Sequence, residues 1–226
     1  MAGEIDIDTV AKAYARWAPV YDLVFGAVFD AGRKASIAAA ERVGGRILDV
    51  GIGTGISLID YARSNHVVGV DYSEAMLRKA QERVREHGLA NVEALAVMDA
   101  QRLGFRDGVF DAVLAQYVIT TVPDPEATLD EFARVTRPGG EIILVNHLGA
   151  ERGLRRDFER SFAPMARKLG WQPEFSWARL EQWAARNGCV RVIERRPMPP
   201  LGHFSLIRFE RLVTVKRPQM AGIAIG

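Results

Sequence analysis

Cysteine, histidine and long apolar runs are scarce in this sequence, and each scarcity argues against a class of protein. The single cysteine, Cys189, cannot form an internal disulfide, and the four histidines offer no recognisable zinc ligand set. Nowhere do about 18 apolar residues follow one another, which is the length that crosses a bilayer. The first residues are acidic where a signal peptide is basic. We therefore expect a cytoplasmic protein without a metal site.

Charge is unevenly distributed along the chain. Lysine and arginine number 30 and acidic residues 28, yet residues 1–150 carry a net charge of −6 and residues 151–226 one of +8. The basic third suggests an anionic surface or polymer as partner, although arginines on solvated faces give the same count. A length of 226 residues with a hydrophobic content of 48% fits one domain, residues 1–226.

Short apolar runs alternate with helical patterns in the middle of the chain, which predicts an α/β fold. Strand–helix alternation gives a doubly wound, mostly parallel sheet with helices on both faces. Ser73 and Pro123-Asp124-Pro125 are typical of helix starts, and Pro138-Gly139-Gly140 is expected to end the third helix before the fifth strand. The predicted strands are 46–50, 66–71, 92–97, 109–115 and 141–147, and the helices between them are 55–64, 73–87 and 124–137.

Segments on either side of this core, residues 45–147, have patterns of their own. Residues 1–42 predict a helical cap of two helices, the second opening at Pro19. Residues 148–226 predict further helices and a final antiparallel strand pair that closes one edge of the sheet. Their expected bounds are 153–169 and 176–187 for the helices, and 189–195 and 203–215 for the strands.

A glycine-rich loop follows the first predicted strand, where open parallel sheets bind ligands. Gly51, Gly53 and Gly55 allow positive φ and close approach of a ligand to the backbone, and the helix that follows presents free N–H groups to an anion. A dinucleotide fingerprint needs glycine at position 56, where Ile56 stands. Asp49 would repel a pyrophosphate but attract the ammonium of a methionine group. The loop therefore argues against NAD and FAD.

Polar side chains also follow the next three strands. Asp71, with Tyr72 beside it, ends the second strand, where a carboxylate can accept both ribose hydroxyls. Asp99-Ala100 follows the third strand and can bind an adenine amine, and Gln116 follows the fourth. Each residue alone has a structural explanation, because glycines make turns and an aspartate after a strand often caps a helix. Their joint order is far more specific.

The whole set resembles the seven-stranded S-adenosylmethionine-dependent methyltransferases over residues 45–147. This resemblance implies S-adenosyl-L-methionine as cofactor and methyl transfer as activity. Residues 14–26 and 203–212 look like the bacterial phosphatidylethanolamine N-methyltransferases, which convert that headgroup stepwise to phosphatidylcholine. The N-terminal Tyr-Asp pattern is also similar to quinone-biosynthesis C-methyltransferases, and this alternative stays open.

Two other classes of function are weighed against methylation of a lipid. A nucleic-acid methyltransferase is not expected, because residues 116–119 read Gln-Tyr-Val-Ile where an Asn-Pro-Pro-Tyr acceptor motif would stand, and no RNA-binding module is appended. A protein that binds adenosylmethionine only for regulation is the non-enzymatic alternative.

An ammonium acceptor must lose a proton before it can attack a methyl group, so a general base is expected. His147, at the end of the fifth strand, is the first candidate, because a histidine titrates near working pH. Tyr21 is its candidate partner, since the related phosphobase methyltransferases imply a tyrosine–histidine dyad. Both residues also have structural explanations, namely core packing for Tyr21 and a local hydrogen bond for His147.

A phospholipid acceptor implies further contacts. Tyr14 and Trp17 share the helical face of Tyr21, and Tyr117 can contact a trimethylammonium through its ring or can simply pack in the core. A lipid phosphate favours arginine, and the candidates are Arg33, Arg152, Arg155, Arg156 and Arg208, of which Arg152 and Arg208 are preferred without a sharp sequence basis. Apolar residues of the cap and the basic third suggest peripheral association with an anionic membrane surface, on the inner face of the membrane.

Overall fold

The computed structural model describes residues 29–149, 175–199 and 202–213. A helix over residues 29–43 opens the described part of the chain. The elements that follow are β1 (Arg46–Val50), η1 (Ile56–Asp60), β2 (His66–Asp71), α2 (Glu74–Glu86), β3 (Val92–Val97), β4 (Phe110–Gln116), α3 (Pro125–Val135), β5 (Thr136–His147), α5 (Trp177–Asn187), β6 (Val190–Met198) and β7 (Phe204–Arg211).

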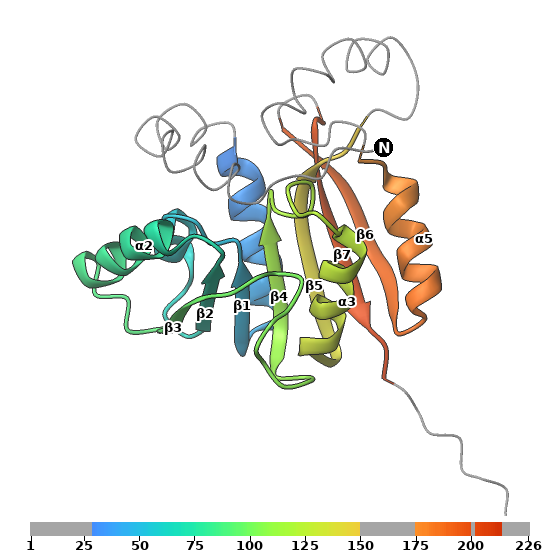
Figure 1. Ribbon diagram of the computed structural model, residues 1–226. Coiled ribbons are helices and arrows are strands. Elements are labelled where there is room, and N and C mark those ends of the chain that lie inside the picture. The colour runs from blue at the N-terminus through green and yellow to red at the C-terminus, as the bar shows by residue number, and fades with distance from the viewer. Residues whose placement is uncertain (1–28, 150–174, 200–201, 214–226) are drawn as a thin grey trace, which may run out of the picture.

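Seven strands form a single sheet in the order β3-β2-β1-β4-β5-β7-β6 (Figure 1). Strands β1 to β5 pair in parallel, and β7 runs antiparallel to both β5 and β6. This architecture confirms the predicted doubly wound sheet with an antiparallel C-terminal pair. The winding reverses between β1 and β4, so the loops after these two strands flank the crevice where such sheets bind ligands.

Hydrophobic cores lie on both faces of the sheet. On one face Ile47 belongs to a buried cluster that includes the helix over residues 29–43, η1 and α2. On the other face its neighbour Leu48 belongs to a cluster that includes Phe132 of α3 and Trp183 of α5. Successive residues of a strand point to opposite faces, so strands buried on both sides read as continuous apolar runs. None of the helices in the described ranges is long and apolar enough to cross a bilayer.

Helix starts follow the predicted capping chemistry. The side chain of Ser73 accepts a hydrogen bond from the Met76 amide at the start of α2, and Asp124 accepts one from the Ala127 amide at the start of α3. Pro125 occupies the first turn of α3, where its missing N–H costs nothing. These caps set the two crossovers on their faces of the sheet.

The segment after the glycine loop differs from the prediction. The sequence predicts a helix over 55–64, but η1 is a 3-10 helix of five residues that ends at Asp60. Tyr61 leaves the helical conformation with φ −73° and ψ 134° and is only 3% exposed. Its hydroxyl donates a hydrogen bond to Asp49 on β1. The tertiary contacts of Tyr61 therefore override the local helical pattern.

The Pro-Gly-Gly sequence is also placed differently from the expectation. It was predicted to lie between the third helix and the fifth strand, but α3 ends at Val135 and β5 begins at Thr136. Pro138-Gly139-Gly140 thus lies inside β5, where the pairing with β4 shifts its register and Gly139 has φ 76°. Proline and glycine within a strand commonly mark such an irregularity.

Candidate active site

The glycine loop adopts the backbone conformation that its composition predicts. Gly51, Gly53 and Gly55 have φ of 71°, 57° and 73°. The amides of Gly51 and Ile52 donate to the Val70 carbonyl at 2.8 and 3.1 Å, which ties the loop to β2. A β-carbon on Gly51 would strike Val118, and one on Gly55 would meet Leu58 and Ala80 at 2.9 Å. At Gly53 a β-carbon would meet nothing within 4 Å, so the loop borders open space there.

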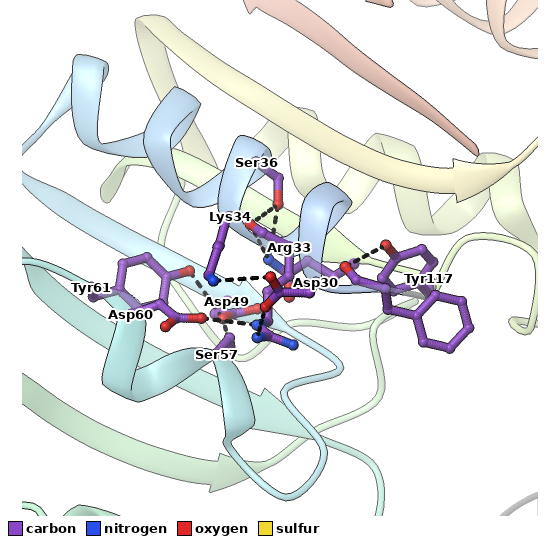
Figure 2. A network of polar contacts seen from close by, with 11 residues as sticks. Asp30, Arg33, Lys34, Ser36, Asp49, Ser57, Asp60, Tyr61 and Tyr117 are labelled. Atoms are coloured by element: carbon purple, nitrogen blue, oxygen red, sulfur yellow. Dashed lines mark hydrogen bonds and ion pairs between the residues drawn. The ribbon is translucent and has the colours of Figure 1, made fainter. Parts of the chain in front are cut away.

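Asp49 lies inside the protein with its carboxylate between two hydroxyl groups (Figure 2). Its Oδ2 accepts hydrogen bonds from Ser57 Oγ and from Tyr61 Oη, both at 3.0 Å, and the residue is 1% exposed. Burial raises the pKa of Asp49 to about 7, while the two hydrogen bonds oppose this rise. Sequence reasoning missed Ser57 and Tyr61. The sequence did contain a signal for them, namely two hydroxyl side chains four residues apart that follow an acidic residue of the strand.

The carboxylate of Asp71 holds the glycine loop and the start of α2 together. Its Oδ2 accepts a hydrogen bond from the Gly53 amide at 2.8 Å, and its Oδ1 accepts one from the Ser73 amide at 2.8 Å. Burial raises the pKa of Asp71 above its usual range. Each oxygen keeps a further lone pair, so both can still accept a hydroxyl. Tyr72, beside it, is 48% exposed.

Asp99 and Ala100 follow β3 at the same edge of the sheet. The Oδ1 of Asp99 accepts a hydrogen bond from the Gln101 amide at 2.9 Å, which fixes the carboxylate close to the backbone. Ala100 is partly buried against the core of the α3 face. With Asp49 and Asp71, Asp99 adds a third carboxylate at the carboxyl ends of successive strands, a set that suits a cationic ligand better than a pyrophosphate.

At the end of β4, two predicted site residues contact the helix over residues 29–43. The side-chain amide of Gln116 donates to Ser36 Oγ at 2.9 Å and to the Arg33 carbonyl at 3.3 Å. Tyr117 has φ 63°, which is uncommon for a residue with a side chain. Its hydroxyl donates to the Phe29 carbonyl at 3.0 Å (Figure 2), and burial raises the pKa of this phenol.

An aromatic cluster lies at the ends of β4, β5 and β7. The Tyr117 ring is 4.3 Å from the ring of Phe29 and 5.3 Å from that of Phe204, measured between centroids. His147 is partly buried, and its ring lies 6.0 Å from the stacked ring of His203 and 6.4 Å from Phe204. The sequence did not indicate that His203 lies beside His147, because their proximity depends on the register in which β7 pairs with β5.

Arg208, which the sequence predicts as a phosphate ligand, is engaged in ion pairs away from this aromatic cluster. Its guanidinium donates to both oxygens of Glu141 at 2.7 and 2.8 Å and to Glu194 at 2.8 Å. It pairs in register with Ile143, four residues before the end of β5 at His147, and it is 17% exposed. Arg208 is therefore committed to an ion-pair network that joins β5, β6 and β7.

Six of the predicted residues lie outside the described residues, namely Tyr14, Trp17, Tyr21, Arg152, Arg155 and Arg156. The parts of the chain that are described contain no group of three or more histidine, cysteine or acidic side chains that could hold a metal ion.

Comparison with known proteins places this site in a family. Residues 48–144 match the family described as "Methyltransferase domain". The chain is 40% identical over 207 residues to the phosphatidylethanolamine N-methyltransferase of Cereibacter sphaeroides, which covers 92% of this chain and 100% of the relative. The chain belongs to the S-adenosylmethionine-dependent methyltransferases.

Other methyltransferases share smaller parts of the chain or the fold alone. A demethylmenaquinone methyltransferase of Thermus thermophilus is 36% identical over 140 residues, which are 58% of this chain and 63% of that protein. The solved structure of an S-adenosylmethionine-dependent methyltransferase from Aquifex aeolicus has a TM-score of 0.64 at 17% identity and covers 88% of this chain and 98% of that one. At this identity the likeness shows the fold.

S-adenosyl-L-methionine is the cofactor of this methyltransferase. The residues of the site fit the molecule. The loop borders open space at Gly53, where close approach to the backbone requires a residue without a β-carbon. Asp71 keeps lone pairs that can accept the two ribose hydroxyls. The carboxylates near the carboxyl ends of β1, β2 and β3 match the positive charges of a sulfonium and an ammonium.

Proposed function

We propose that this methyltransferase transfers methyl groups stepwise to the amine of the phosphatidylethanolamine headgroup, towards phosphatidylcholine. The observation that carries the proposal is the extent of the match to the Cereibacter sphaeroides enzyme. That match covers 92% of the chain at 40% identity, whereas the demethylmenaquinone methyltransferases of Thermus thermophilus and Thermobifida fusca cover 58% and 74% of it at 36% and 33% identity. Because the sheet binds the cofactor, the acceptor is chosen by the segments outside residues 48–144, and a match over 92% of the chain includes most of these segments.

The cofactor is assigned to the residues at the carboxyl ends of the first four strands. Asp71 would accept hydrogen bonds from the ribose hydroxyls, Asp99 would accept one from the adenine amine, and Asp49 would attract the methionine ammonium. When bound, S-adenosyl-L-methionine supplies a methyl group on a positively charged sulfur. The remaining residues that line this site are Gly51, Gly53, Gly55, Tyr72, Ala100 and Gln116.

Proton removal is assigned to His147, at the end of β5. The ammonium of the headgroup gives its proton to the imidazole, which frees the nitrogen lone pair for in-line attack on the methyl carbon. Bound S-adenosyl-L-methionine would supply the methyl carbon for the new N–C bond, and its sulfur would keep the electron pair of the C–S bond. The rings of Tyr117 and Phe204 stabilise the cationic product by cation–π contact.

Contact with an anionic membrane surface is part of the same proposal, because the acyl chains of the acceptor stay in the bilayer. The basic charge of residues 151–226 supports it, since anionic lipids attract arginine. On β6, Val192 and Ile193 are 37% and 39% exposed, and the same strand carries the exposed side chains of Arg191 and Arg196, which pair with Glu210 and Glu194. Flotation with vesicles should therefore rise with anionic lipid content and fall with salt.

The decisive assay offers labelled S-adenosylmethionine and liposomes of defined headgroup, and then separates the lipids. Label in the mono-, di- and trimethylated headgroups is the expected result. Label in a demethylmenaquinone substrate, with none in phosphatidylethanolamine, would replace the proposal with a quinone C-methyltransferase. Binding of the cofactor without transfer to either acceptor would leave a regulatory protein.

The base is tested with His147→Ala. We expect unchanged affinity for S-adenosylhomocysteine and a transfer rate lower by about 100-fold, the smaller end of the usual contribution of a general base. This deficit should shrink as the pH rises, because solvent then deprotonates the amine. His87→Ala, at the exposed end of α2, is the matched control. Turnover by the His147 variant at the wild-type rate would reject the assignment.

A further inference from the structure

The first turns of the helix over residues 29–43 are joined to η1 by an ion pair that methyl transfer, as described above, does not use. The Nε of Arg33 lies 2.9 Å from Asp60 Oδ2, and its Nη2 lies 2.5 Å from Asp30 Oδ1. The Arg33 side chain is 12% exposed, and those of Asp30 and Asp60 are 36% and 23% exposed. A partly buried arginine between two carboxylates is held more firmly than a surface pair.

The same turns contact the end of β4 on their other side. Gln116 donates to the Arg33 carbonyl and to Ser36 Oγ, and Ser36 Oγ itself donates to the Arg33 carbonyl at 2.8 Å. One turn earlier, the backbone carbonyl of Phe29 accepts a hydrogen bond from the hydroxyl of Tyr117. The side chain of Arg33 therefore contacts η1, and its backbone carbonyl contacts the end of β4 (Figure 2).

Asp60 connects this ion pair with the cofactor loop. It is the last residue of η1, which begins directly after Gly55. Ser57, inside η1, donates to Asp49, and so does Tyr61, which follows η1. A movement of the loop that shifts η1 must therefore also shift Asp60, and with it the partner of Arg33.

We propose that Arg33 is a positioning residue that couples occupancy of the glycine loop to the first turns of the helix over residues 29–43, and through Gln116 and Tyr117 to the aromatic cluster at the ends of β4, β5 and β7. Contiguous contacts of this kind carry coupling between sites when both sites bias the same element. The proposal concerns the cofactor and holds for any acceptor, so it does not depend on a phospholipid substrate.

Hydrogen exchange of the full-length chain tests the coupling without any acceptor. In the wild type, saturating S-adenosylhomocysteine should slow exchange of the amides at residues 30–36 by about fivefold or more, the lower end of typical coupling between sites. In Arg33→Gln, S-adenosylhomocysteine should still bind, but its added protection of these amides should disappear. Asp60→Asn, which changes the other partner with little change of shape, should give the same result.

Lys34→Gln is the matched control. Lys34 also pairs with Asp30, at 2.9 Å, but its side chain is 61% exposed and its ion pair joins two residues of the same helix. This variant should keep the full protection. Arg33→Lys, which restores a cation without the planar fork, should recover part of it.

Steady-state kinetics provide the second readout. If Arg33 positions the aromatic cluster, the KM for the acceptor should rise severalfold in Arg33→Gln, while the Kd of S-adenosylhomocysteine changes less. A lower melting temperature with wild-type protection and wild-type KM means that Arg33 only stabilises the fold, and this overturns the proposal. Absence of protection in the wild type overturns it as well. Should Arg33→Gln fail to fold, Asp60→Asn decides between the outcomes.

Discussion

Replacement of Asp49 by asparagine should stabilise the folded protein above neutral pH and weaken its hold on the cofactor. The pKa of Asp49 rises from 3.8 to about 7 on folding, chiefly because burial disfavours the charged form. Protonated Asp49 therefore makes its full contribution to the free energy of unfolding below about pH 4, and this contribution is lost as the pH rises through 7. A rise of this size corresponds to about 4 kcal/mol of folding free energy. Asparagine avoids that loss and can still accept hydrogen bonds from Ser57 and Tyr61.

Urea denaturation without cofactor, at half-unit steps from pH 5 to pH 8, measures this effect. The free energy of unfolding of Asp49→Asn, relative to wild type, should grow by several kcal/mol across the series. Glu82→Gln, which changes an exposed carboxylate on α2, should show no such trend. Calorimetric titration at pH 8 should show weaker binding of S-adenosylmethionine to Asp49→Asn. A constant difference between Asp49→Asn and wild type at all pH values would refute the reasoning, because it would mean that Asp49 does not ionise within this range.

Three further substitutions test separate parts of the site and the sheet. Gly53→Ala should cost about 1 kcal/mol of stability for the left-handed backbone but lower cofactor affinity by at least about tenfold, because its β-carbon enters the open space; an unchanged Kd would show that the cofactor lies elsewhere. Asp71→Ala should weaken S-adenosylhomocysteine binding by a similar factor through loss of its contacts with the ribose and the Gly53 amide, which calorimetry measures. Arg208→Met should cost about 3 kcal/mol in urea denaturation, because Glu141 stays partly buried without this partner while Glu194 keeps its ion pair with Arg196. A higher KM for the lipid in the folded variant would support the role of Arg208 as a phosphate ligand.

The sequence predicts the sheet well because buried parallel strands are continuous apolar runs. The predicted bounds of β1, β2 and β3 coincide with the observed ones, and those of β4 differ by one residue at each end. Ser73 and Asp124 mark helix starts because a capping side chain acts on amides two or three residues away, within reach of local reasoning. Features decided by neighbours in sequence were thus predictable.

Features decided by distant contacts were not. The helical pattern after Gly55 stops early because Tyr61 reaches Asp49, twelve residues away on another element. Arg208 appeared available for a phosphate, since nothing in the sequence shows that β7 enters between β5 and β6 and brings two glutamates to it. The same register brings His203 to His147. These pairings depend on how strands align, which periodicity alone does not fix.

The position of β7 also constrains the order in which the protein can fold during synthesis. Although β7 follows β6 in the chain, it lies between β6 and β5, and β6 joins the sheet through β7 in the described residues. Until residues 204–211 leave the ribosome, the backbone of β5 has an open edge and β6 has no strand to pair with. A nascent chain stalled before this point would expose an unpaired edge, the kind of surface that recruits other chains into aggregates. Chaperone dependence should therefore be greatest in the short interval before β7 is made.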